Sequence, residues 1–164
     1  ANGGGTLWKM DINDNEPIEI SETSFTSYVI SPDSTSILYT KPNHELLLAS
    51  QEEFEEYGGK SIFQLPDKPS DVFWSPDQNL VLILLYHCEN SACNQDKYFL
   101  INIKEQNRIK EYPHINHHLP CGFSPDSKSL VFVERPSKII FINFSEEIIF
   151  AFKSSDWVIC PHSN

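Results

Sequence analysis

A tripeptide that returns at regular intervals, Ser-Pro-Asp, constrains the fold of this 164-residue chain more than any other feature. It stands at residues 31–33, 75–77 and 124–126, and a degenerate copy at residues 155–164 retains Pro161. The four prolines are spaced by 44, 49 and 36 residues. A repeat of this length indicates that each copy forms one small unit, and that the units stack on their neighbours to bury a core.

Every full copy places the tripeptide between two apolar segments. A short apolar run precedes it, at residues 28–30, 72–74 and 121–123, and a β-rich run follows. Proline presets a φ of about −65° at the second position of a turn, and Ser and Asp side chains hydrogen-bond the nearby backbone. The sequence therefore predicts structural turns at Ser31, Pro32, Asp33, Ser75, Pro76, Asp77, Ser124, Pro125 and Asp126.

Two further short strands follow each turn, as at residues 98–103 and 108–112. Regularly spaced short strands indicate an all-β fold, and a repeat of about 40–50 residues fits one four-stranded antiparallel blade of a β-propeller. We expect residues 1–164 to form a single segment of a larger propeller, whose open blade edges favour homo-oligomers. The predicted ranges are 6–24 for a partial blade, 25–67, 68–114 and 115–154 for full blades, and 155–164 for the start of another.

The turns and strands together resemble a known repeat. Ser-Pro-Asp turns combined with a strand of the type found at residues 7–11, Leu-Trp-Lys-Met-Asp, are similar to the WD-like repeats of the TolB family. Similar blades form the propellers of prolyl oligopeptidase-type peptidases. Glycine commonly follows Asp in that pattern, whereas this chain has Ser34, Gln78 and Ser127. We expect no strain there, because a type I turn does not require a positive φ at its third position.

Charge and hydropathy narrow the range of partners. The formal net charge is −11, which argues against nucleic acid and anionic membrane surfaces, because both carry negative charge themselves. No run of 18 apolar residues is present, so no membrane span is expected. No cofactor motif was found, and the expected partner is a protein or a peptide. Residues 51–60, with four glutamates, are expected to form a solvated turn that ends at Gly58 and Gly59.

Cys88 and Cys93 flank a four-residue loop between two predicted strands. Such a pair fits a hairpin disulfide with a modest gain of about 2–3 kcal/mol, and free thiols or a metal site are the alternatives. A disulfide would favour an exported protein, periplasmic or extracellular, because disulfides persist in oxidising compartments.

The segment from Tyr112 to Cys121 holds the donor types that zinc or copper prefers. The candidate ligands are His114, His117, His118 and Cys121. The alternative is a solvated loop whose last residue, Cys121, enters a core strand. In an up-and-down blade this segment and the loop at residues 87–97 are expected on the same face.

No pattern of catalytic residues is found in the sequence. There is no Gly-x-Ser-x-Gly elbow and no phosphate-binding glycine loop, and the serines of the three tripeptides are assigned to turns. The sequence thus favours a non-catalytic interaction or scaffold module. The alternative is the substrate-gating propeller of a prolyl oligopeptidase-type serine peptidase whose catalytic domain lies outside this chain. A metal-dependent site on the histidine-rich face is a third hypothesis.

Overall fold

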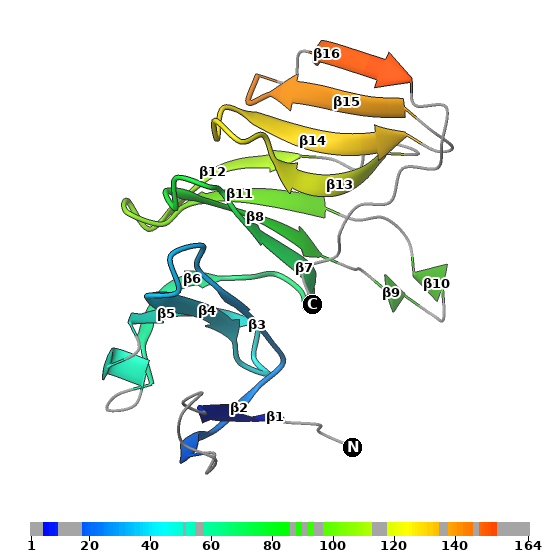
Figure 1. The fold of residues 1–164 in the computed structure, drawn as a ribbon. Coiled ribbons are helices and arrows are strands. Elements are labelled where there is room, and N and C mark those ends of the chain that lie inside the picture. The colour runs from blue at the N-terminus through cyan, green and yellow to red at the C-terminus, as the bar shows by residue number, and fades with distance from the viewer. Residues whose placement is uncertain are drawn as a thin grey trace. The chain divides into compact units, whose positions relative to one another are not determined.

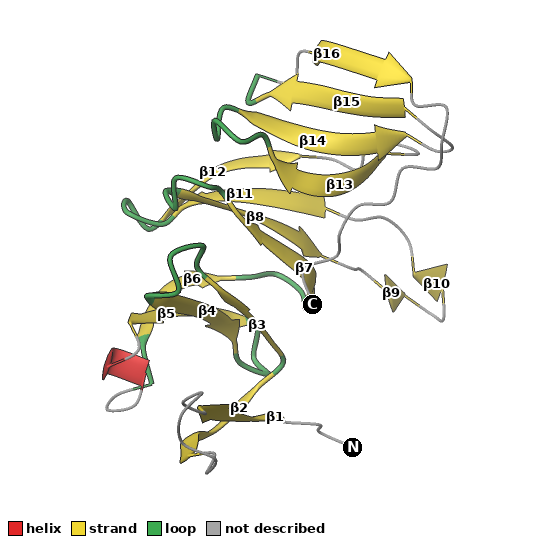
Figure 2. Cartoon of the chain, in the orientation of Figure 1, coloured by secondary structure: helices red, strands yellow, loops and turns green. Residues whose placement is uncertain are grey.

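Strands make up most of the chain that the structure describes, as Figure 2 shows. The structure is a computed structural model. The chain consists of two compact units, Ala1–Ser70 and Asp71–Asn164. Within the described part, no helix is long and apolar enough to cross a membrane. The described residues are 5–9, 18–50, 52–54, 58–85, 88–89, 92–93, 97–112, 118–134, 138–145 and 148–153.

Figure 1 shows the strands in chain order. The first unit contains β1 (Gly5–Lys9), β2 (Ile18–Phe25), β3 (Ser27–Ile30), β4 (Ser36–Thr40), β5 (Glu45–Ser50) and β6 (Lys60–Gln64). From β7 (Pro69–Trp74) the chain continues through β8 (Leu80–Leu85), β9 (Cys88–Glu89), β10 (Ala92–Cys93), β11 (Lys97–Asn102), β12 (Asn107–Tyr112), β13 (His118–Phe123), β14 (Ser129–Glu134), β15 (Lys138–Asn143) and β16 (Ile148–Lys153).

Three four-stranded sheets repeat one topology. Their orders are β3-β4-β5-β6, β7-β8-β11-β12 and β13-β14-β15-β16, and neighbouring strands pair antiparallel. Two smaller sheets pair β1 with β2 and β9 with β10. The fold class predicted from the sequence, all-β with four-stranded antiparallel blades, is confirmed. The predicted start of another blade, residues 155–164, lies outside the described residues.

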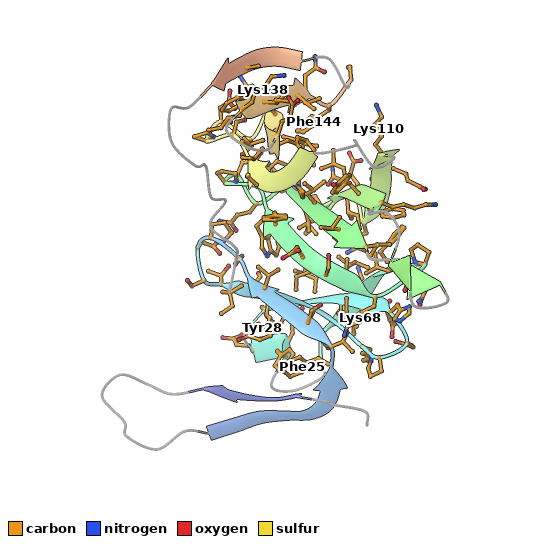
Figure 3. All side chains as sticks on the ribbon, turned by 90° about the vertical axis from the view of Figure 1, so that its right-hand side faces the viewer. Phe25, Tyr28, Lys68, Lys110, Lys138 and Phe144 are labelled. Carbon is orange, nitrogen blue, oxygen red and sulfur yellow. The ribbon has the colours of Figure 1, made fainter. Side chains whose placement is uncertain are left out.

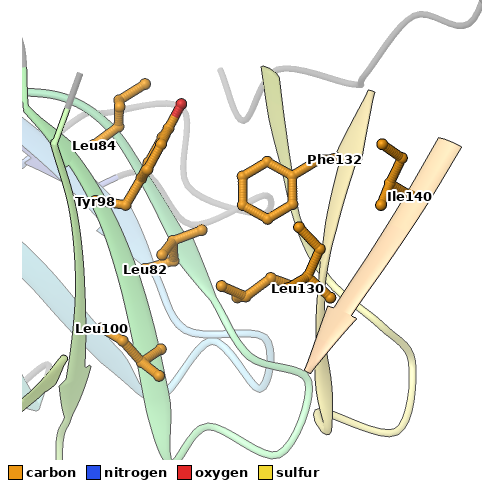
Figure 4. Packing of buried hydrophobic residues seen from close by; sticks show 8 residues of the cluster. Leu82, Leu84, Tyr98, Leu100, Leu130, Phe132 and Ile140 are labelled. Carbon is orange, nitrogen blue, oxygen red and sulfur yellow. The ribbon is translucent and has the colours of Figure 1, made fainter. Parts of the chain in front are cut away.

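In the second unit, two sheets pack face to face around an apolar core, which Figure 4 shows from close by. The rings of Tyr98 and Phe132 meet edge to face with centroids 5.8 Å apart. Strand β8 reads Leu-Val-Leu-Ile-Leu-Leu without alternation because all but its first residue are buried, on both faces of its sheet. The buried core comprises Leu82, Leu84, Tyr98, Leu100, Leu130, Phe132, Ile140 and Ile142.

The first unit buries one face of the β3–β6 sheet beneath a short helical turn at residues 52–54. Ser50 and Glu53 cap this turn reciprocally. The Glu53 amide donates to Ser50 Oγ at 3.2 Å, and the Ser50 amide donates to Glu53 Oε2 at 2.9 Å. The turn places the Phe54 ring on the Tyr39 ring, with centroids 5.1 Å apart. The expected solvated turn is therefore exposed at Glu52 and Glu53 but anchored in the core by Phe54.

Candidate interaction surface

Each repeat turn is held by the same three hydrogen bonds. In the first copy, Ser31 Oγ donates to Asp33 Oδ1 at 2.7 Å and accepts from the Ser36 amide at 2.9 Å. The Ser34 amide donates to the Ser31 carbonyl oxygen at 2.8 Å. The second and third copies repeat this pattern with distances of 2.6–3.0 Å. The serine hydroxyls thus close turns, and all three serines are buried.

The residue after each Asp adopts a left-handed backbone conformation. The φ angles are 62° at Ser34, 63° at Gln78 and 60° at Ser127. The expectation that these positions are unstrained is wrong, because the type I turn is followed by one residue that must take a positive φ to rejoin the next strand. Glycine adopts this conformation without steric cost, whereas other residues do not. His44, at a similar turn between β4 and β5, has a φ of 65°.

One hydrogen bond links the turns of two neighbouring sheets in the second unit. The Asp77 amide donates to Ser127 Oγ at 3.0 Å. Burial raises the pKa of the Asp77 carboxyl, but hydrogen bonds from Ser75, Asn79 and Ser127 outweigh it and lower the pKa. Hydrogen bonds from the Ser124 hydroxyl and the Lys128 amide lower the pKa of Asp126. Both carboxylates therefore act as charged turn anchors.

The predicted cysteine pair lies in the small β9–β10 ladder, where the backbone of Cys88 is directly opposite that of Cys93. The side chains of both residues lie outside the described part, so their disulfide stays a prediction.

The predicted metal ligands are only partly covered. His114 and His117 lie outside the described residues, and His118 is described only by its backbone pairing with Glu134. Cys121 is disulfide-bonded, which takes its sulfur out of the proposed ligand set. No group of three metal-binding side chains occurs among the described residues.

Tyr28 and Ile30 are exposed hydrophobic residues that the sequence pattern did not indicate. Their exposed fractions are 50% and 54%, and no other large hydrophobic side chain is exposed among those that the structure describes. Both lie on β3 two residues apart, so they point to the same face of the sheet. Figure 3 shows Tyr28 beside Phe25, whose ring it meets edge to face at 5.7 Å. We call this pair the Tyr28–Ile30 patch. Residues 28–30 are all apolar, so their sequence carried no alternation that could have identified the exposed face.

Two buried polar atoms have no hydrogen-bond partner in the described part of the chain, the Tyr39 hydroxyl and Trp74 Nε1. Burial, followed by the charge of Glu45, raises the pKa of Tyr39. The Tyr39 hydroxyl lies 3.7 Å from the position that a Cβ on Gly58 would occupy. Both atoms therefore represent a local cost in stability rather than a designed polar network.

No model of a known protein family matches this sequence, and no curated protein matches it. Among solved structures, the Swd1 β-propeller domain from Myceliophteria thermophila is similar over 96% of this chain and 52% of its own, with 15% identity and a TM-score of 0.63. An acylaminoacyl peptidase in complex with Z-Gly-Gly-Phe-chloromethyl ketone is similar over 94% of this chain and 29% of its own, with 14% identity and a TM-score of 0.66.

A second acylaminoacyl peptidase, from Pyrococcus horikoshii, is similar over 88% of this chain and 27% of its own, with 14% identity and a TM-score of 0.63. This chain thus spans about half, or less, of the solved chains that it matches. Likeness at such low identity establishes the fold alone. The chain is a partial β-propeller, of a kind that occurs both in a WD-repeat propeller and in the propellers of peptidases.

Proposed function

We propose that this chain is a non-catalytic protein-interaction module. The observation that carries the proposal is the Tyr28–Ile30 patch, an aromatic and an aliphatic side chain exposed side by side on the first strand of a blade. Fully burying an exposed side chain of this size contributes about 1.5–3 kcal/mol. Because Tyr28 and Ile30 are half exposed, a partner that covers the rest of both gains about 1.5–3 kcal/mol in total.

The electrostatics of the chain support a polypeptide partner of neutral or positive charge. The net charge of −11 repels polyanions and attracts basic surfaces over the range of a Debye length. The likeness to the Swd1 β-propeller domain, which extends over 96% of this chain, is in keeping with such a role. It is support from the fold, since sequence identity is only 15%.

The second candidate function is a propeller that gates access to a serine peptidase. The specific observation in its favour is that two acylaminoacyl peptidases and the tricorn protease are among the similar structures. The repeat serines do not supply the chemistry, because their hydroxyls are hydrogen-bonded within turns. In this case the nucleophile would come from another part of the protein.

The nucleotide sequence on both sides of the codons for Ala1 and Asn164 separates these two functions. The interaction module predicts a reading frame without a catalytic domain. A frame that continues into a Gly-x-Ser-x-Gly elbow followed by Asp and His in the order of an α/β-hydrolase would overturn it and establish the gating propeller.

A further inference from the structure

One tripeptide of the sequence has no role in the surface described above, Asn143-Phe144-Ser145. It is the only place in the 164 residues where Asn is followed two residues later by Ser or Thr. Enzymes of the eukaryotic secretory pathway attach sugar to the Asn of such a tripeptide when its middle residue is not Pro. Because the pattern also occurs by chance, a modification site requires in addition an accessible asparagine and a chain that enters the right compartment.

The fold places this tripeptide at the end of a blade. Asn143 is the last residue of β15, where its backbone pairs with Ser129 of β14, and the pairing of β15 with β16 ends at Ile142 and Ile148. Successive strand residues point to opposite faces of a sheet, so Ile142 enters the buried core and Asn143 points away from it. Asn143 is partly exposed and Ser145 is exposed. The two polar side chains of the tripeptide therefore lie at the surface of the second unit.

The middle residue holds this turn in place. The Phe144 side chain packs against the apolar core of the second unit, and its carbonyl oxygen accepts a hydrogen bond from Lys110 Nζ at 3.3 Å. Figure 3 labels both residues. The Ser145 amide donates to Asn143 Oδ1 at 3.0 Å, which closes a local turn of the kind that Asn commonly forms. A sugar is attached to the side-chain nitrogen of Asn, so the modification leaves Oδ1 and this hydrogen bond in place.

The second unit contains a similar turn that lacks the hydroxyl. Asn102 ends β11 as Asn143 ends β15, and each pairs with the first residue of the neighbouring strand that precedes it in the chain. Asn102 is also partly exposed, and its Oδ1 accepts a hydrogen bond from the Glu105 amide at 3.0 Å. Two residues after Asn102 stands Lys104, which is exposed like Ser145. Asn102 is therefore a matched asparagine outside the recognised tripeptide.

The cysteines indicate a compartment in which this modification occurs. Cys121 is disulfide-bonded, and the backbone of Cys88 lies directly opposite that of Cys93. Disulfides form and persist in oxidising environments such as the lumen of the endoplasmic reticulum, and they are rare in the cytosol. Sugars are added to asparagine in the same lumen. A chain that acquires the Cys121 disulfide there also meets the glycosylating enzyme.

We propose that Asn143 is an N-glycosylation site of this protein. The co-reactant is an oligosaccharide joined to a lipid through a diphosphate. Asn143 Nδ2 forms a bond to the anomeric carbon of the sugar, and the bond from that carbon to the diphosphate breaks. The lipid diphosphate leaves, and the amide nitrogen gives up one proton. The inference goes beyond the proposed function and does not depend on it, because an interaction module and a gating propeller present the same turn.

The test is peptide mass spectrometry of the protein isolated from its natural source. Trypsin cleaves after Lys138 and Lys153 and releases a peptide in which Asn143 is the only asparagine. Peptide N-glycosidase in heavy-oxygen water converts a glycosylated asparagine to labelled aspartate and leaves an unmodified asparagine unchanged. The expected result is labelled aspartate at position 143 and an unlabelled, intact Asn102.

Variants of the full chain, secreted from eukaryotic cells behind a signal peptide, separate the tripeptide from the fold. Ser145→Ala should abolish the modification, Ser145→Thr should retain it, and Lys104→Ser should add a second sugar at Asn102. Ser145 is exposed and contributes its backbone amide to the turn, so its substitution should leave the circular dichroism spectrum unchanged. The proposal is overturned if Asn143 of the natural protein is unmodified. It is also overturned if the secreted Lys104→Ser chain carries a sugar at Asn102 and none at Asn143.

Discussion

Gln78 has a φ of 63°, a left-handed conformation that costs a residue with a Cβ about 1–2 kcal/mol. Glycine removes this cost but gives the unfolded chain more conformational freedom, which takes back about 0.5–1 kcal/mol. We therefore predict that Gln78→Gly raises the free energy of unfolding by about 0.5–1 kcal/mol. For a chain of this size, that corresponds to a rise of about 1–4 °C in melting temperature.

Two matched variants make the test sharp. Ser34→Gly should give the same gain, because Ser34 is exposed and its φ is 62°. Ser127→Gly should give little or none, because it removes the hydroxyl that accepts the Asp77 amide, a bond worth about 1 kcal/mol net. Urea unfolding followed by circular dichroism measures all three against Gln78→Ala, which retains the strain. The reasoning is refuted if Gln78→Gly lowers stability or if Ser127→Gly gains as much as Ser34→Gly.

Three further changes test other parts of the structure. Tyr39→Phe should raise the free energy of unfolding by about 1 kcal/mol, because it removes a buried hydroxyl without a described partner; a loss in urea unfolding would contradict this. Gly59→Ala should cost about 2 kcal/mol or more, and Gly58→Ala only about 1, because a Cβ on Gly59 would lie 2.8 Å from Ala49 Cβ; equal losses would refute the contact. The folded-state pKa of Asp126 lies below its unfolded-state value, so the stabilisation that its carboxylate gives the fold is present above about pH 3.9 and is lost as the pH falls through the folded-state pKa. Asp126→Asn should therefore reduce the loss of stability at acid pH, measured as the free energy of unfolding against pH. An unchanged loss at acid pH would show that the Asp126 carboxylate does not stabilise the turn.

Local chemistry explains why the architecture was predictable. The Ser-Pro-Asp tripeptide contains both partners of its main side-chain hydrogen bond, Ser Oγ and Asp Oδ1, so the turn forms wherever the tripeptide occurs between apolar runs. The sign of φ at the following residue was missed, because it depends on how the hairpin closes and not on the turn alone. The capping box of Ser50 and Glu53 was also legible as Ser-x-x-Glu, but the density of glutamates favoured a solvated turn.

The candidate site was less predictable because exposure on a strand depends on the neighbouring sheet. Tyr28 and Ile30 are as apolar as Val72 and Phe123, and nothing in their own segment distinguishes an uncovered blade face from a covered one. Only the three-dimensional arrangement shows that the side chains of Tyr28 and Ile30 on β3 are exposed. For the histidine-rich segment at residues 112–121 the sequence predicted more than the structure can test. Its donor types suggested a metal site, but most of these donors lie outside the described residues.

The measurement that tests the central claim most directly is the rate of tyrosine nitration in the purified 164-residue chain, resolved by peptide mass spectrometry. The account predicts that Tyr28, half exposed, reacts readily, whereas Tyr39 and Tyr98, with exposed fractions of 2% and 0%, are protected until the chain unfolds. Nitration of Tyr28 as slow as that of Tyr39 would show that the Tyr28–Ile30 patch is already covered. This result would contradict the proposal that the patch is an exposed interaction surface.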